Sequence, residues 1–265
     1  KFETAEAYAD YINFFGFKGV SFSGGEPLLF FDRTLHYLKT VRERCKPEIY
    51  TWMYTNGILG DEEKFRKLAD AGLNEVRFDI GATGFKLDKI GFAKGIIPNI
   101  TIEIPAIPEE KEKLKQLLPA MVQAGVTNLN LHQLRLTRHN VEKLSKRGYT
   151  IIPAEQPIVL ESELAALEIL EFARENQINI GINYCSFYFK NRFQKAGFRK
   201  QVASALANPG ETITEKGFIR EQNEETIGYK TITISDERNG NSNPTELKLP
   251  NKTLYISRET AMKKT

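Results

Sequence analysis

The stretch Val20-Ser21-Phe22-Ser23-Gly24-Gly25-Glu26-Pro27 carries the first strong structural signal of the chain. A short apolar run ends in two glycines, which allow a sharp turn and a close approach of a ligand to the backbone. Pro27 holds Glu26 in an extended conformation. The Glu26 carboxylate and the carbonyl groups around it then form a rigid rim of acceptors that suits a primary ammonium group. Taken alone, the stretch fits a plain strand-to-helix turn equally well.

The same pattern of a strand followed by a loop recurs along the first half of the chain. Strand-like runs begin near Val20, Ile49, Glu75, Ile100 and Asn128, about 25 to 29 residues apart. This spacing leaves room for one helix in each interval, which predicts a parallel sheet with right-handed crossovers. Several runs are apolar nearly throughout, as is typical of strands covered on both faces.

Helical patterns occupy these intervals. They cover residues 2–15, two stretches that begin at the predicted caps Asp32 and Asp61, residues 85–93 and residues 109–124. Pro119 should kink or break the last of these helices. Gly16 is a plausible stop for the first.

The rhythm changes after residue 135. We expect helices over 139–147 and 162–175, an extended stretch over 150–160 and a buried strand over 178–184. The end of the chain is β-like, with strands over 229–235 and 247–256 around a loop at 239–244. The predicted domains are therefore a core (1–135), a barrel-closing or substrate region (136–205) and a β-rich C-terminal extension (206–265).

Composition excludes some classes of protein. The chain has 265 residues and a net charge of +3, which is too small to indicate a nucleic-acid partner by itself. It contains no apolar run of 18 residues and no signal peptide, so we expect a cytoplasmic protein without a membrane partner. Cys45 and Cys185 are two distant cysteines, and we expect them to be small buried side chains rather than a disulfide.

Two motifs resemble a known family. Gly24-Gly25-Glu26-Pro27 after a buried strand matches the Gly-Gly-Glu-Pro motif of the radical S-adenosylmethionine (SAM) superfamily, and Thr55-Asn56-Gly57 resembles the Thr-Asn-Gly at the following strand. The resemblance covers about residues 1–135, and more loosely extends to about 190. It implies an α/β fold, namely a partial (β/α)6 TIM-like barrel with a small β-rich C-terminal extension. The first strand of this barrel, and the loop after it that binds an iron–sulfur cluster in the family, would be missing from this sequence.

The resemblance also implies roles for individual residues. Gly24, Gly25, Glu26 and Pro27 would hold the ammonium group of SAM, and Thr55, Asn56 and Gly57 its ribose or carboxylate. The overall pattern is loosely similar to activating enzymes for glycyl-radical enzymes. These have an Asp at the position of Asp79 and a Lys two residues later, where this chain has Gly81.

Glu103 lies on the strand that flanks adenine in the family. His132 resembles a His at the sixth strand end of the activating enzymes. Each of these residues has a structural alternative. Asp79 could be a helix cap or turn residue, Glu103 could point into a polar layer, and His132 could be structural.

The family uses SAM with a [4Fe-4S] cluster, which three closely spaced cysteines hold. This sequence has no such group, so the resemblance implies cluster ligands upstream of Lys1 and a chain that is inert by itself. In the parent protein, a reductant such as flavodoxin or ferredoxin would reduce the cluster. SAM would be cleaved to a 5′-deoxyadenosyl radical, which abstracts hydrogen from an unknown small molecule, protein or RNA.

Other functions remain open. The basic stretch 190–200 carries five positive charges, no acids and interleaved aromatic residues, which would suit RNA-directed radical SAM modification. Alternatively, Phe193 and Phe198 could face the core of a helix with solvated charges. Oxygen and nitrogen ligands on successive strand ends (Glu26, Asp79, Glu103 and His132) could also form a non-redox metal-dependent barrel. A barrel that only binds partners is the last alternative.

Overall fold

A computed structural model describes residues 2–154, 156–221, 231–234 and 245–248. The chain divides into two compact units, residues 1–194 and 195–265. The first unit is built on a six-stranded sheet whose strands follow one another in chain order. These strands are β1 (Gly19–Phe22), β2 (Tyr50–Thr55), β3 (Glu75–Phe78), β4 (Asn99–Pro105), β5 (Asn128–His132) and β8 (Gly181–Cys185).

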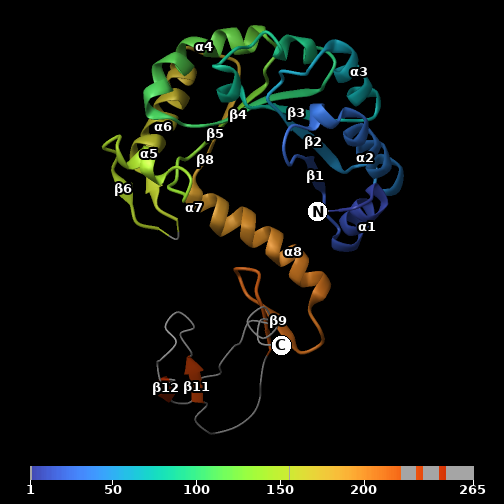
Figure 1. Cartoon of the computed structure of the whole chain (residues 1–265), viewed down its shortest axis with the longest axis vertical. Coiled ribbons are helices and arrows are strands. Elements are labelled where there is room, and N and C mark those ends of the chain that lie inside the picture. The colour runs from blue at the N-terminus through green and yellow to red at the C-terminus, as the bar shows by residue number, and fades with distance from the viewer. Residues whose placement is uncertain (1, 155, 222–230, 235–244, 249–265) are drawn as a thin grey trace. The chain divides into compact units, whose positions relative to one another are not determined.

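Every neighbouring pair in this sheet is parallel, as the strand–helix rhythm predicts. The sheet is curved, and its helices lie on the outer side of the arc (Figure 1). Strands β1 and β8 form its two edges. This mixed α/β architecture fits the partial TIM-like barrel expected from the motifs.

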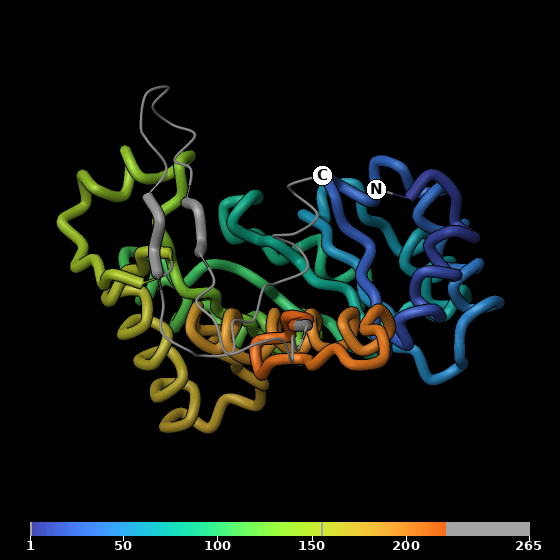
Figure 2. Tube along the Cα trace, turned by 90° about the horizontal axis from the view of Figure 1, so that it is seen from below, coloured from blue at the N-terminus to red at the C-terminus, as the bar shows by residue number. Residues whose placement is uncertain are grey.

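The main helices of the first unit are α1 (Ala5–Phe15), α2 (Phe31–Arg44), α3 (Glu62–Asp70), α4 (Lys111–Gln123) and α6 (Leu160–Glu175). In the trace, α1 lies beside α2 and α4 lies beside α6 (Figures 1 and 2). None of the helices in the described part of the chain is long and apolar enough to cross a membrane.

Local sequence explains where most helices begin and end. Thr4 accepts a hydrogen bond from the Ala7 amide and Gly16 ends α1 in the left-handed conformation, as predicted. Asp61 caps α3 by accepting from the Lys64 amide at 2.8 Å. The predicted cap at Asp32 is wrong, because a 3-10 turn, η1 (Pro27–Phe30), leads directly into α2 and leaves Asp32 in its first turn.

Two other helix predictions are corrected. Helix α4 runs through Pro119 without a break, because the buried side chains of Leu114, Leu118 and Met121 anchor both halves to the core. The region 85–93 forms only a 3-10 turn, η3 (Ile90–Ala93), which follows another, η2 (Ile80–Thr83). Phe85 has a φ of +69°, a left-handed conformation that a helix cannot include.

The remaining elements of the first unit are short. They are η4 (Pro108–Glu110), α5 (Val141–Ser145), α7 (Phe187–Phe189) and the antiparallel pair β6 (Ile151–Ile152) and β7 (Ile158–Val159). A π-helix, η5 (Lys190–Lys195), follows α7.

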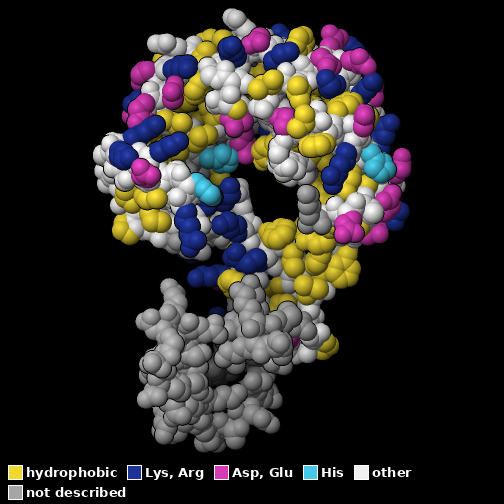
Figure 3. Space-filling model, viewed as in Figure 1, with side chains coloured by type: hydrophobic (Ala, Val, Ile, Leu, Met, Phe, Trp, Pro, Cys, Tyr) yellow, Lys and Arg dark blue, Asp and Glu magenta, His cyan; other side chains and the backbone are white. Residues whose placement is uncertain are grey.

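The two faces of the sheet differ in polarity. On β4, Ile100, Ile102 and Ile104 are fully buried in the core, whereas Thr101 and Glu103 point to the opposite face. That face carries polar and aromatic side chains from every strand, among them Ser21, Trp52, Tyr54, Arg77, Asn130 and His132. The expectation of strands that are apolar on both faces is therefore wrong. A few acidic and histidine side chains lie at the inner margin of the first unit, whereas most of the visible acidic side chains lie on its outer rim (Figure 3).

The second unit contains α8 (Ala196–Leu206) and two antiparallel strand pairs. The pairs are β9 (Glu211–Ile213) with β10 (Ile219–Glu221), and β11 (Thr231–Ile234) with β12 (Thr245–Lys248). The predicted strands over 229–235 and 247–256 fall only partly on described residues, and the predicted loop at 239–244 lies outside them. The domain boundaries predicted at 135 and 205 stay predictions.

Candidate functional site

Glu26 connects the ends of the first two strands. Its Oε1 accepts hydrogen bonds from the Thr55 hydroxyl (2.7 Å) and the Leu28 amide (3.0 Å), and its Oε2 accepts from the Asn56 amide (2.8 Å). The two sequence motifs therefore form a single hydrogen-bonded unit. Because these bonds engage both carboxylate oxygens, Glu26 positions the loops.

The glycine loop is open to solvent. Gly24 and Gly25 have φ angles of +104° and +112°, which strongly favour glycine, and no atom lies within 4 Å of a Cβ built at either position. Among the described residues, no hydrogen bond uses the carbonyl oxygens of these two glycines. The loop thus presents unoccupied backbone acceptors, as a bound ammonium group requires.

Side chains also shape the turn after β2. The Thr55 hydroxyl accepts from the Gly57 amide at 2.9 Å, and Asn56 Oδ1 accepts from the Ile58 amide at 2.9 Å. Gly57 has a φ of +76°, and a Cβ there would lie 2.9 Å from the Phe78 ring. A cavity of about 230 Å³ adjoins this turn, with Asn56, Phe78 and Lys89 among its lining residues.

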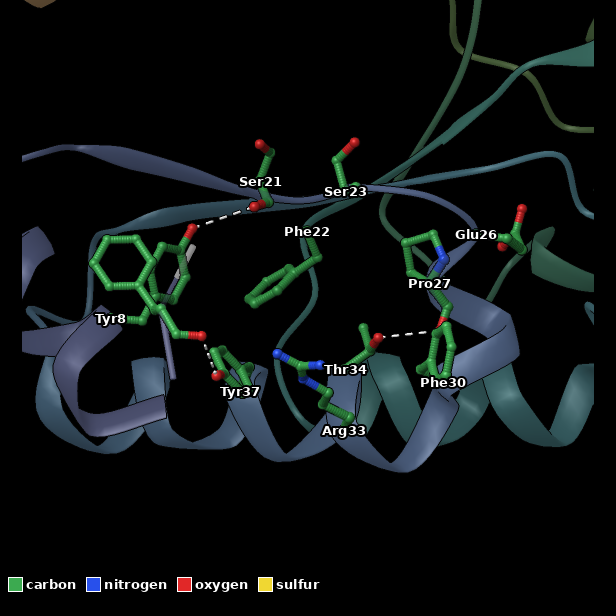
Figure 4. Close-up of a pocket in the computed structure, with 12 residues that line it drawn as sticks. Tyr8, Ser21, Phe22, Ser23, Glu26, Pro27, Phe30, Arg33, Thr34 and Tyr37 are labelled. Atoms are coloured by element: carbon green, nitrogen blue, oxygen red, sulfur yellow. Dashed lines mark hydrogen bonds between the residues drawn. The ribbon is translucent and has the colours of Figure 1, made fainter. Parts of the chain in front are cut away.

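Pro27 lines a larger pocket of about 510 Å³ beneath the glycine loop, together with Gly24 and Glu26. Helices α1 and α2 contribute Tyr8, Arg33 and Tyr37 to its wall. Figure 4 shows Phe22 pointing into this pocket, whereas Ser21 and Ser23 point to the other side of the strand. The Tyr8 hydroxyl donates to the Ser21 carbonyl at 3.2 Å, and burial raises the pKa of Tyr8 to about 12.

Asp79 is a cap and turn residue, which was the structural alternative for its position. Its Oδ1 accepts from the Gly81 amide at 3.0 Å and caps the η2 turn, and the residue is exposed. It makes no contact with the Glu26 unit among the interactions of the described residues.

Glu103 is the centre of a polar network on the inner face of the sheet. It accepts hydrogen bonds from the Tyr54 hydroxyl (3.1 Å), Arg77 Nη1 (2.9 Å) and Asn130 Nδ2 (3.1 Å), and its Oε1 lies 2.8 Å from His132 Nε2. Its side chain is only 10% exposed. Burial opposes ionisation, but the hydrogen bonds from His132 and Asn130 and the charge of Arg77 outweigh it and lower the pKa of Glu103 to about 2.

Arg77 extends the network toward the neighbouring strand. It forms an ion pair with Glu75 at 2.9 Å, and its guanidinium lies 4.9 Å from the centre of the Trp52 ring. Burial disfavours the charged form, but the hydrogen bond and charge of Glu75 raise the pKa of Arg77 above its usual range. Sequence reasoning missed Glu75, Arg77 and Trp52. The alternation Glu75-Val76-Arg77-Phe78 was the available signal.

His132 lies at the end of β5, directly opposite Cys185 on β8. The neighbouring Cys185 thiol and the Glu103 carboxylate favour the protonated imidazole and raise the pKa of His132 to about 9. The structure thus brings Glu103 and His132 together, while Glu26 bonds to the turn after β2. In the part of the chain that the structure describes, no group of three or more His, Cys, Asp or Glu residues could hold a metal ion.

The residues present do not fit a four-iron cluster. The sequence contains two cysteines. Cys45 caps the end of α2, Cys185 ends β8, and both are buried free thiols. Two separate thiols cannot supply the three or four thiolates that such a cluster uses.

Comparison with known proteins points to one family. Residues 1–91 match the sequence model of the Radical SAM superfamily, a range that contains both motif loops. A protein of Methanocaldococcus jannaschii that carries the provisional name glycyl-radical enzyme activating enzyme is 29% identical over 213 residues. The alignment covers 76% of this chain and 55% of that relative, so the chain spans about half of the relative's length. In the matched motifs, their joined geometry and the parallel sheet that carries them, the chain is similar to the radical SAM superfamily.

Proposed function

We propose that the whole protein is a radical SAM enzyme and that this chain binds the methionine part of SAM at the ends of β1 and β2. The observation that carries this proposal is the Glu26 bridge, which fixes the glycine loop against the Thr55–Gly57 turn. The open carbonyls of Gly24 and Gly25 then accept hydrogen bonds from the ammonium group. An ammonium group offers three donors and no acceptor, so a rim of carbonyls is a suitable partner.

Asn56 supplies a complementary donor. Its Oδ1 is engaged by the Ile58 amide, but its side-chain NH2 makes no hydrogen bond within the described residues. This group can donate to a ribose hydroxyl or to the methionine carboxylate. Thr55 is buried and bonded on both sides, so it acts through the turn and through Glu26. Asp79, Glu103 and His132 stay proposed contacts for the rest of SAM.

The [4Fe-4S] cluster would be held elsewhere in the whole protein. With two buried thiols, this chain offers no ligand set, so the cluster ligands would come from a part of the whole protein outside these 265 residues. In the family, SAM bound at a reduced cluster supplies a radical that abstracts hydrogen. The name of the relative suggests a protein substrate, and a flavodoxin- or ferredoxin-type reductant would supply the electron.

Calorimetric titration of the chain with SAM tests the proposal. We expect SAM to bind more tightly than methylthioadenosine, which lacks the amino-acid part. Gly25→Ala should weaken SAM binding about 10-fold or more, because the loop would leave its left-handed conformation. Gly84→Ala is the matched control, since Gly84 also has a positive φ (+68°) and open space at the Cβ position. Equal binding of the two ligands, or an unaffected Gly25→Ala variant, would contradict the proposal.

A second candidate function rests on a specific observation. The alternative in which Phe193 and Phe198 face the core is wrong, because each is 54% exposed. In the first unit, the Phe189 and Phe193 rings lie 5.2 Å apart, and Arg192 Nη1 donates to the exposed Tyr188 hydroxyl at 2.8 Å. Exposed rings beside cations suit the bases and phosphates of single-stranded RNA, which supports an RNA-directed enzyme.

Fluorescence anisotropy with a labelled single-stranded RNA tests whether the chain is an RNA-directed enzyme. RNA binding should fall steeply as salt rises from about 50 to 200 mM, and Phe193→Ala should weaken it. Phe14→Ala, which removes an exposed ring on α1, is the control. Affinity that is independent of salt and of Phe193 would remove this candidate.

A further inference from the structure

The smaller of the two cavities described above lies between the turn after β2 and the segment that follows β3. Its lining residues fall within 56–58 and 78–90, so the glycine loop at 24–27 has no part in it. Its volume of about 230 Å³ is below the range of about 300–1,000 Å³ that is typical of sites for drug-sized ligands. A smaller molecule would therefore fill it.

The floor of this cavity is apolar and closely packed. Phe78, Ile80 and Ile90 line it, and each of these residues is at most 2% exposed. A Cβ built at Gly57 would lie 2.9 Å from the Phe78 ring and 3.5 Å from the Lys89 Cβ, so the turn, the ring and the lysine stem touch one another. Such a floor suits a small apolar group.

The rim of the cavity carries three charged side chains, Lys86, Asp88 and Lys89. None of them forms an ion pair within the described part of the chain, and Lys86 and Asp88 also have no side-chain hydrogen bond there. Lys89 Nζ donates to the Gly60 carbonyl at 3.5 Å, which is a long hydrogen bond. Two cations and one anion are thus available to a ligand.

The backbone that leads into the rim is held in an unusual conformation. Gly84 and Phe85 have φ angles of +68° and +69°, and a non-glycine residue in this region is uncommon. The Phe85 amide donates to the Ile80 carbonyl at 2.9 Å, and Lys113 Nζ lies 4.2 Å from the centre of the Phe85 ring. The turn before Lys86 is therefore fixed on both sides, as is common at ligand clamps.

The three charges and the floor together select one kind of ligand. A carboxylate would accept hydrogen bonds from the two ammonium groups of the rim, and an ammonium group would donate to Asp88. A purely anionic ligand would be repelled by Asp88, and a purely cationic one by the lysines. A zwitterion with an apolar side chain satisfies all three charges and covers the floor.

We propose that this cavity is a binding site for a free α-amino acid with an apolar side chain, such as methionine. Lys86 and Lys89 hold its carboxylate, Asp88 holds its ammonium group, and its side chain rests on the three floor residues. This site goes beyond the SAM site proposed at the ends of β1 and β2 and does not rest on it.

Calorimetric titration of the full chain with L-methionine tests the proposal. Three analogues each lack one part of the ligand: glycine lacks the side chain, 4-(methylthio)butanoate the ammonium group and 3-(methylthio)propylamine the carboxylate. We expect each to bind at least about 10-fold more weakly than methionine. An analogue that binds as tightly as methionine, or no binding of methionine, would overturn the proposal.

Charge-removing variants locate the site. Replacing both lysines (Lys86→Gln with Lys89→Gln) should weaken methionine binding about 10-fold, and Asp88→Asn about 3-fold, because the aspartate is exposed. The matched controls are Lys39→Gln and Asp70→Asn, exposed residues without an ion pair among the described residues. Unchanged affinity in the variants of the rim would overturn the proposal. If a variant proves unfolded, the analogue series on the wild-type chain decides.

Since methionine is also a part of SAM, a titration with methionine in the presence of saturating SAM separates the two sites. We expect the affinity for methionine to be unchanged. Loss of methionine binding would mean that the amino-acid part of SAM fills this cavity, which would overturn a separate site. If SAM itself does not bind, the proposed function fails, whereas the methionine titration still decides this proposal.

Discussion

Replacing Glu103 by Gln should destabilise the first unit by about 3 kcal/mol. The carboxylate receives four contacts at 2.8 to 3.1 Å, two of them from the ionisable groups of Arg77 and His132. An amide keeps one acceptor but places an NH2 group against donors. Hydrogen bonds to charged groups contribute about 1.5–3 kcal/mol each, and breaking a buried ion pair costs about 3–5 kcal/mol.

The lower part of this range applies for two structural reasons. Arg77 keeps its ion pair with Glu75 and its contact with Trp52. His132 is one-third exposed, so water replaces part of its lost interaction. Glu103 itself has little access to water, and the remaining cost is therefore substantial.

Urea denaturation at pH 7 measures this effect through the fluorescence of Trp52, the single tryptophan in the sequence. The matched control is Asp10→Asn, the same change of acid to amide in an exposed ion pair with Arg44 at 3.0 Å. That pair should contribute less than about 1 kcal/mol. If Glu103→Gln loses no more stability than Asp10→Asn, the reasoning about the buried network is refuted.

Further predictions concern pH and the motif loops. Because the folded pKa of Glu103 is about 2 against 4.5, its contribution to stability is present above pH 4.5 and is lost as the pH falls toward 2. The pKa of His132 is about 9 in the folded chain and 6.5 in the unfolded chain, so its contribution to stability is present below pH 6.5 and is lost as the pH rises to 9. The two effects together predict that the urea midpoint is highest between about pH 4.5 and 6.5. Gly57→Ala should cost about 2 kcal/mol more than Gly84→Ala, since only the first places a Cβ against an aromatic ring, and similar denaturation midpoints for the two variants would contradict this. Thr55→Val removes the donor to Glu26 and the acceptor of the Gly57 amide, so it should lose about 1–3 kcal/mol and weaken SAM binding, whereas Thr55→Ser should retain both properties in the same assays.

The strands could be predicted closely from the sequence. The expected starts at Val20, Ile49 and Ile100 lie within one residue of the observed ones, because glycine-rich loops and helix caps separate short apolar runs. The polarity of the inner face was missed. The alternation Ile100-Thr101-Ile102-Glu103-Ile104 indicated a polar face on this strand. It was missed because the apolar residues of the buried face make up most of each run.

The site could be predicted only where its residues are close in sequence. Both motif loops were recognised, but the bond between Glu26 and Thr55 joins residues 29 positions apart and depends on the register of β1 and β2. The pairing of His132 with Cys185 spans a longer interval with no local signal. Cys185 was therefore expected to be only a buried apolar side chain.

The order of the strands has a consequence for how the first unit assembles. The pairs from β1 to β5 join residues 23 to 31 positions apart, as in Trp52 with Glu75 and Gly19 with Tyr50. The last pair joins Asn128 to Gly181, which are 53 positions apart, about twice as far. Doubling a loop adds about 0.6 kcal/mol to the entropy cost of its closure, and distant pairings form more slowly. We expect the five leading strands to associate one after another during synthesis and β8 to dock last. Cys185 would then reach its register partner His132 only at the final step of folding.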